Sequence, residues 1–194
     1  ARIGLATGLQ PSRLGSMDND SLLPVGVVTY YQRLRDNGYR VGCVGKLDLN
    51  KPDPYVGRNG DLPRTYQCGF AHPMETEGKM NAGASPTPRG PYGFYLQDKG
   101  LFDRFRDDYA MRRSRGWRVG VSHDSVLATE DFADSFIGRH AAEWIARVQD
   151  DAPWHLFVSF VGPHDPFDPP TEYADRYRNA HVPPPIGDGM EGKP

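Results

Sequence analysis

The chain has 194 residues, of which 38% are hydrophobic, and its formal net charge is −2. This length suits one domain with a substantial core, and the slight negative charge gives no basic field for nucleic acid. No apolar stretch approaches the length that crosses a membrane, and two cysteines are too few for a disulfide framework.

The first half of the chain predicts two helices and a strand. A short helix is expected over residues 2–7 and ends at Gly8, and a second helix is expected over residues 27–37. The apolar residues of 40–44 then predict a buried strand, which Lys46 follows closely. Cys43 is expected to be a small buried residue of that strand.

Glycine and proline predict long loops. The 22 glycines and 18 prolines make up about a fifth of the chain, against roughly 12% in an average protein. Residues 51–92 are especially rich in them and are expected to be a loop that Phe70 anchors in the core. The chain has neither an initiating methionine nor a terminating element, so we expect it to be a piece of a longer protein.

Helices dominate the prediction for the second half. One or two helices are expected over residues 94–115, where Arg112, Arg113 and Arg115 read as a solvated helix end. The clearest helical pattern covers residues 129–148, with Thr129 as its cap. A short helix is expected over residues 171–177, and the chain from Asn179 onward is expected to be extended.

The stretch that begins at Trp154 carries the strongest functional signal. Its large apolar residues predict a strand buried on both faces, which stops at Gly162-Pro163 and leads to His164. A polar residue just past the carboxyl end of a buried strand lies where open α/β sheets bind ligands. The simpler interpretation is a solvated histidine in a turn.

The alternation of helices and strands predicts an α/β fold with a largely parallel sheet. Lys46 and His164 both follow strand ends, so they are expected to face one pocket. An ammonium group suits a sulfate or phosphate oxygen, and an imidazole can protonate a leaving alkoxide.

Three motifs in the same order resemble the sulfatase family. Residues 38–48, GYRVGCVGKLD, are similar to its segment Gly-Tyr-x-Thr-x-x-x-Gly-Lys-x-His, and residues 162–166, GPHDP, are similar to its Gly-Pro-His-x-Pro loop. The opening ARIGLATG resembles the end of the signature Cys-x-Pro-(Ser/Ala)-Arg with its following Thr-Gly. On this alignment the signature cysteine lies three positions before Ala1. The resemblance is to arylsulfatase-like members of the alkaline phosphatase superfamily, and it spans nearly the whole chain.

The resemblance implies a fold and an activity. The fold is the alkaline-phosphatase-like one, a mixed, largely parallel sheet flanked by helices, and residues 1–194 would be part of a single catalytic domain truncated at both ends. The full-length protein would be a sulfuric ester hydrolase that cleaves sulfate monoesters of small molecules or carbohydrates, with a formylglycine nucleophile formed just upstream of Ala1. A divalent cation, commonly calcium, would be bound by ligands outside this chain. The resemblance gives no nucleic-acid or membrane partner.

Four residues of this chain match functional positions of the family. Arg2 would hold the formylglycine, and Lys46 would contact both the sulfate and the nucleophile. His164 would bind a sulfate oxygen and protonate the departing alcohol. Asp48 stands where the family has a histidine, and a carboxylate is a poor proton donor there. Asp48 is therefore expected either to bind a hydroxyl or cationic part of the substrate or to point away from the site.

Two other functions stay open. One is a phosphonate or phosphodiester hydrolase of the same superfamily, which the change at Asp48 makes worth testing. The other is a non-catalytic binding relative that kept the fold and lost the nucleophile. In every case we expect the 194-residue chain by itself to bind no catalytic metal and to hydrolyse nothing.

Overall fold

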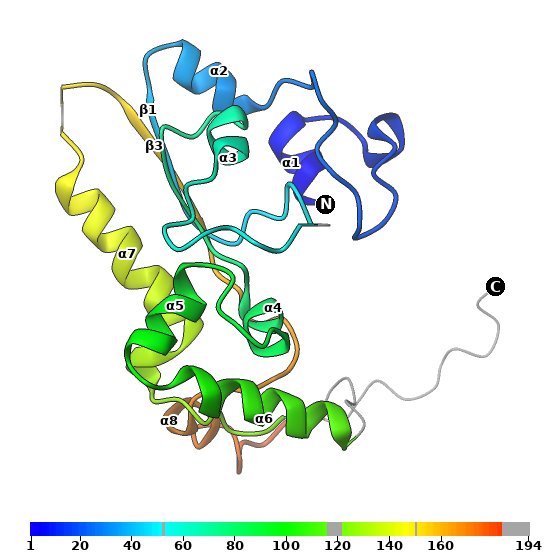
Figure 1. Ribbon diagram of the computed structural model, residues 1–194, viewed down its shortest axis with the longest axis vertical. Helices are drawn as coiled ribbons and strands as arrows, with labels where there is room; N and C mark the ends of the chain where they lie inside the picture. The colour runs from blue at the N-terminus through cyan, green and yellow to red at the C-terminus, as the bar shows by residue number, and fades with distance from the viewer. Residues whose placement is uncertain (52, 116–121, 150, 184–194) are drawn as a thin grey trace.

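The computed structural model describes the chain in four stretches, residues 1–51, 53–115, 122–149 and 151–183. Within them the chain is an α/β fold, in which a small parallel sheet is flanked by helices (Figure 1). The predicted fold class is therefore confirmed. No helix in these stretches is long and apolar enough to cross a membrane.

The sheet has three described strands. β1 (Arg40–Gly45) is the central one and pairs in parallel with β2 (His72–Glu75) on one side and β3 (Trp154–Ser159) on the other. The strand expected over residues 40–44 is confirmed, and five of its six residues are buried. In β3 only Ser159 is fully buried, so the predicted burial on both faces is wrong for the described structure. The physical reason is that β3 is an edge strand among the described residues.

Eight α-helices and two 3₁₀ helices surround the sheet within the described residues. Those before residue 90 are α1 (Arg2–Thr7), η1 (Pro11–Leu14), α2 (Tyr30–Asp36), α3 (Pro63–Gln67) and α4 (Lys79–Ala84). Those after it are α5 (Pro91–Asp98), α6 (Phe102–Ser114), η2 (Thr129–Asp131), α7 (Ala133–Arg147) and α8 (Thr171–Ala174).

β1 joins two hydrophobic cores because successive residues of a strand face opposite sides. Val41 and Cys43 belong to a core that includes residues of α1 and α2 together with Phe70. Val44 belongs to the other core, which α4, α5, α6 and α7 form. The predictions of a buried Cys43 and of Phe70 as a core anchor are confirmed.

Helix starts explain most differences from the expected boundaries. The helix over residues 2–7 is confirmed as α1, with Gly8 in the left-handed conformation at its end. α2 begins at Tyr30 rather than at residue 27 because Thr29 caps it. The Thr29 hydroxyl accepts from the Gln32 backbone N–H at 3.1 Å, and the Gln32 side chain accepts from the Thr29 N–H at 2.7 Å.

The expected loop over residues 51–92 is wrong in part, because it contains α3, β2, α4 and the start of α5. These elements have four to eight residues each, which is too short for a clear hydrophobic period.

Two predictions for the second half also need correction. Thr129 does not cap the long helix: it begins η2, and α7 starts only after Phe132. Arg112 is not solvated, because its guanidinium is buried and donates to Asp108 at 2.7 Å and to the carbonyl of Asp124 at 3.0 Å. The one or two helices expected over residues 94–115 are two, α5 and α6, and α5 begins three residues earlier, at Pro91.

The end of the chain agrees with expectation in part. The predicted helix over residues 171–177 is shorter, because α8 ends at Ala174. Asn179 lies in a turn and residues 180–183 have no regular structure, and the rest of the predicted extended segment lies outside the described residues.

Candidate functional site

The carboxyl ends of the three parallel strands lie at one edge of the sheet, and Lys46 follows β1 there directly. A pocket of about 250 Å³ at this edge is lined by Lys46, Asp48 and His164, among others. A neighbouring pocket of about 220 Å³ is lined by Arg2, Asp48, Lys51 and His164, among others. The structure therefore brings together all four residues that the sequence singled out. Together with Lys51, which lines both pockets, they form what we call the rim site (Arg2, Lys46, Asp48, Lys51 and His164).

Asp48 is the hub of the rim site. The Arg2 Nη1 donates to its Oδ2 at 2.8 Å and also to the carbonyl of Lys46 at 2.9 Å. The ammonium groups of Lys46 and Lys51 lie 3.5 Å and 3.7 Å from the Asp48 carboxylate. Asp48 therefore points into the site, where its charge already has three cationic partners.

Backbone geometry aims these side chains. Gly45 has a φ of 110°, and a Cβ atom there would lie 2.1 Å from the Ser159 carbonyl oxygen, so only glycine fits between β1 and β3 at this point. Asp48 itself has a φ of 53°, a left-handed conformation that aspartate adopts more readily than most residues. These two turns place Lys46 and Asp48 beside each other at the strand end.

Lys46 is a partly desolvated cation. Its side chain is only 16% exposed, and burial lowers its pKa from the ordinary value for lysine. The nearby charges of Lys51 and Arg2 lower this pKa further, whereas Asp48 opposes the shift. An ammonium in such a position has few waters to lose when it contacts an anionic oxygen.

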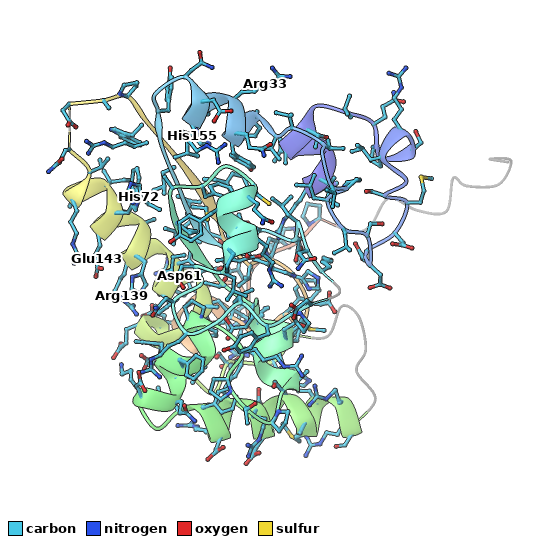
Figure 2. The ribbon with its side chains drawn as sticks, turned by 45° about the horizontal axis from the view of Figure 1, so that its top comes forward. Arg33, Asp61, His72, Arg139, Glu143 and His155 are labelled. Atoms are coloured by element: carbon cyan, nitrogen blue, oxygen red, sulfur yellow. The ribbon has the colours of Figure 1, made fainter. Side chains whose placement is uncertain are left out.

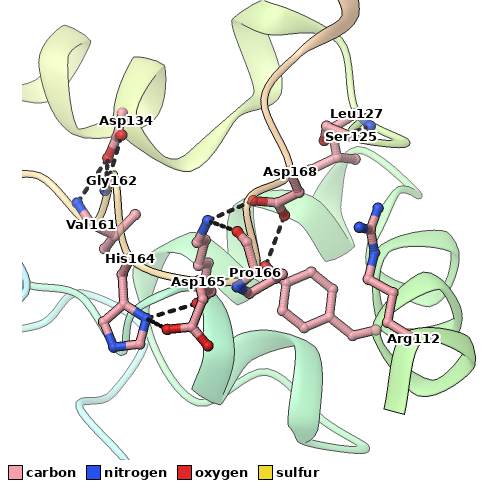
Figure 3. A network of polar contacts seen from close by, with 12 residues as sticks. Arg112, Ser125, Leu127, Asp134, Val161, Gly162, His164, Asp165, Pro166 and Asp168 are labelled. Carbon is pink, nitrogen blue, oxygen red and sulfur yellow. Dashed lines mark hydrogen bonds and ion pairs between the residues drawn. The ribbon is translucent and has the colours of Figure 1, made fainter. Parts of the chain in front are cut away.

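The ring of His164 is fixed by its neighbour Asp165 (Figure 3). The His164 Nδ1 lies 2.7 Å from the Asp165 carbonyl oxygen and 3.1 Å from a carboxylate oxygen of the same residue. Both oxygens are acceptors, so Nδ1 must carry a proton. Nε2 is then the nitrogen left to bind a ligand or to transfer a proton. The ring is about half exposed, but it is not an isolated turn residue, since it lines both rim pockets.

Two other histidines lie at the opposite ends of the strands. His72 begins β2 and faces the Trp144 ring, and His155 follows the first residue of β3 (Figure 2). The His155 Nε2 is 3.4 Å from the Tyr30 hydroxyl, and burial lowers the pKa of this histidine. Both rings pack against helices and lie outside the rim site.

Two glutamates, Glu75 and Glu77, line the larger rim pocket, and both accept hydrogen bonds from the surrounding fold. Glu75 accepts from the Thr65 hydroxyl at 3.0 Å, and Glu77 accepts from the Gly93 N–H at 2.7 Å, at the start of α5. Burial raises the pKa of Glu75, and it raises the pKa of Glu77 to about 6. These shifts reduce the negative charge that the two carboxyls present to the pocket.

Calcium does not fit the described residues. Within them, no group of three or more His, Cys, Asp or Glu side chains is arranged to hold a metal ion. Asp48, the carboxylate at the centre of the rim site, is surrounded by cations.

Sequence reasoning missed Lys51, although its spacing of three residues from Asp48 was visible. It also missed Lys79 and Asp168, whose buried ion pair lies beneath the loop that carries His164. No local sequence signal marks that pair, because its partners are 89 residues apart.

Comparisons with known proteins agree with the motifs. No family model matches the chain. The choline-sulfatase of Rhizobium meliloti is 26% identical over 96% of the chain and 33% of its own length. The arylsulfatase of Clostridium perfringens is 33% identical over 77% of the chain and 29% of its own length. The uncharacterized sulfatase YidJ of Escherichia coli is 22% identical over 91% of the chain and 31% of its own length.

A solved structure supports the fold. The phosphonate monoester hydrolase of Agrobacterium radiobacter matches with a TM-score of 0.56 at 23% identity, over 90% of this chain and 33% of that one. The chain thus spans about a third of the length of the proteins it matches. The three sulfatases support a sulfatase-family fragment, and the structural neighbour supports the fold.

Proposed function

We propose that this chain, a segment of a sulfatase-family protein, supplies the sulfate-binding side of the active site of a sulfuric ester hydrolase. One observation carries the proposal. Arg2, Lys46 and His164 come from three distant segments and line adjoining pockets at one edge of the sheet. Two cations and an imidazole beside each other suit a sulfated small molecule or carbohydrate.

The nucleophile of this reaction would lie outside the chain. By the family resemblance, a formylglycine three positions before Ala1 would supply a hydroxyl that attacks the sulfur of a sulfate monoester. Arg2 would then neutralise charge next to that group, because its guanidinium is already directed to the rim site.

Each rim residue has a role in this proposal. Lys46 would bind a sulfate oxygen, which would take the place of part of its contact with Asp48. The Nε2 of His164 would protonate the oxygen of the departing alcohol, since Asp165 occupies the Nδ1 side. Asp48 would hold Arg2 and Lys46 in place and limit the positive charge that the substrate meets.

The test uses the full-length protein that contains this chain, with alkyl sulfates as substrates, because their alcohol must be protonated as it leaves. We expect Lys46→Met and His164→Asn each to lower kcat/KM by about 100-fold or more, as is usual for the loss of an acid or of an oxyanion contact. His140→Asn is the matched control, because His140 lies on α7 and faces Glu143. The proposal fails if the full-length protein cleaves no sulfate ester, or if both rim variants keep full activity.

A phosphonate or phosphodiester hydrolase is the second candidate function. Two observations favour this candidate. The chain shares its fold with a phosphonate monoester hydrolase, and Asp48 stands where sulfatases have a histidine. Matched sulfate and phosphonate or phosphodiester substrates separate the two by their ratio of kcat/KM. A residue other than Cys or Ser three positions before Ala1 would instead favour a non-catalytic binding protein.

A further inference from the structure

The loop that carries His164 is fixed on its amino-terminal side by Asp134, in the first turn of α7. The Asp134 carboxylate accepts from the backbone N–H of Val161 at 2.8 Å and from that of Gly162 at 3.1 Å (Figure 3). Charge-assisted bonds to two successive amides fix both the position and the direction of the chain as it leaves β3.

The same loop is fixed on its carboxyl-terminal side by Lys79, the first residue of α4. The Lys79 Nζ donates to the Pro166 carbonyl at 2.7 Å and to the Asp168 carboxylate at 2.5 Å. The second carboxylate oxygen of Asp168 accepts from the Tyr109 hydroxyl at 3.0 Å. The Lys79 and Asp168 side chains are only 5% and 2% exposed, so water competes little for these bonds.

His164 lies midway between these two anchors, two residues after Gly162 and two before Pro166. The intervening Asp165 holds the Nδ1 of the ring, so the direction of Nε2 follows from the position of this short backbone segment. A buried ion pair adds little net stability compared with apolar replacements, because the loss of hydration offsets the attraction. The larger consequence of the Lys79–Asp168 pair is therefore geometric.

We propose that Lys79 and Asp168 are positioning residues that aim the Nε2 of His164 at the leaving-group oxygen. This rests on the proposed function, in which His164 donates a proton. Neither residue lines the rim pockets, and both act through the backbone of residues 164–168.

The test is the double variant Lys79→Met/Asp168→Asn in the full-length protein. Removing both charges leaves no unpaired buried ion, and the asparagine can still accept from Tyr109. For an alkyl sulfate, whose alcohol must be protonated as it leaves, we expect kcat to fall about 10- to 100-fold with little change in KM. For 4-nitrophenyl sulfate, whose phenolate leaves without a proton, we expect a fall of less than about threefold.

The matched control is Arg112→Met/Asp108→Asn. This pair is also buried, with an N–O distance of 2.7 Å, but it bonds within α6 and to the carbonyl of Asp124 instead of to the histidine loop. Any loss of activity in the control should be equal for the two esters, because neither side chain bonds to the loop that carries His164. An equal loss for both esters in the Lys79/Asp168 variant would overturn the proposal.

A second measurement does not depend on activity. Amide hydrogen exchange over residues 161–168 should become at least about tenfold faster in the Lys79/Asp168 variant and stay unchanged in the control. Unchanged exchange in both variants would overturn the positioning role. If the wild-type protein cleaves no sulfate ester, the proposed function fails, and the exchange result still decides whether this pair holds the histidine loop.

Discussion

Asp48 lowers the net positive charge of the rim site, where we propose that the substrate binds. Its carboxylate lies among Arg2, Lys46 and Lys51 and cancels part of their positive charge. A sulfate monoester carries one negative charge, whereas a phosphate monoester carries close to two near neutral pH. The carboxylate therefore opposes the second charge of a phosphate and favours the monoanion.

Replacing Asp48 by asparagine should change this preference. We expect Asp48→Asn in the full-length protein to raise kcat/KM for an aryl phosphate relative to the matched aryl sulfate about tenfold, or about 1.4 kcal/mol. The control is Asp98→Asn, which removes the same charge from a carboxylate that is 57% exposed, lies at the end of α5 and pairs with Arg58. An unchanged ratio of the two substrates in Asp48→Asn would contradict this role.

The start of α5 depends on a buried carboxyl. Glu77 accepts from the Gly93 N–H, but burial outweighs this bond and raises the pKa of Glu77 from 4.5 to about 6. Because the folded state favours the neutral carboxyl, Glu77 contributes to the free energy of unfolding. This contribution is fully present below pH 4.5 and is lost as the pH rises through about 6. The amount lost is about 2 kcal/mol.

Glu77→Gln should remove this pH dependence. The unfolding free energy of the variant relative to wild type should increase by about 2 kcal/mol between pH 4 and pH 8, as measured by urea denaturation. Glu172→Gln is the control, since Glu172 is exposed in the first turn of α8. A difference between Glu77→Gln and wild type that is the same at every pH would contradict the prediction.

Elements with a clear local pattern were predictable from the sequence. β1 is an apolar run that ends at a glycine, and the long face of α7 repeats at helical spacing, so both were found. β2 was missed because its four residues include Pro73 and present no period. The burial of Arg112 was missed because it depends on Asp108 and on the distant carbonyl of Asp124.

The residues of the site also differ in whether the local sequence could reveal them. Lys46 and His164 were predicted because each follows a strand, and parallel strands bring their carboxyl ends together. The hub role of Asp48 was not predictable, because it arises from the left-handed turn that directs its side chain back toward Arg2. The contact of Lys79 with the histidine loop likewise exists only in the folded chain.

In the proposed function, the rim site is one side of a larger active site. The chain spans about a third of its relatives, and β3 has one neighbouring strand within the described structure. Apolar side chains at both ends of β3, those of Trp154 and Phe160, are exposed. The proposed oxyanion-binding cations belong to this chain, whereas the proposed nucleophile and metal ligands would come from the rest of the protein.

If the nucleophile and the metal ligands lie outside this chain, the 194-residue chain by itself should lack both activity and metal binding. We expect it to show no turnover of an aryl sulfate and no rise in Tm when millimolar calcium replaces a chelator, because its described residues offer no ligand cluster. The full-length protein should show both, since a ligand present at 100 times its Kd stabilises a fold by about 2.7 kcal/mol. Enzyme assays and thermal unfolding of the two proteins, matched in concentration, provide the comparison. Measurable sulfate ester cleavage by the chain alone would mean that the nucleophile lies within these 194 residues.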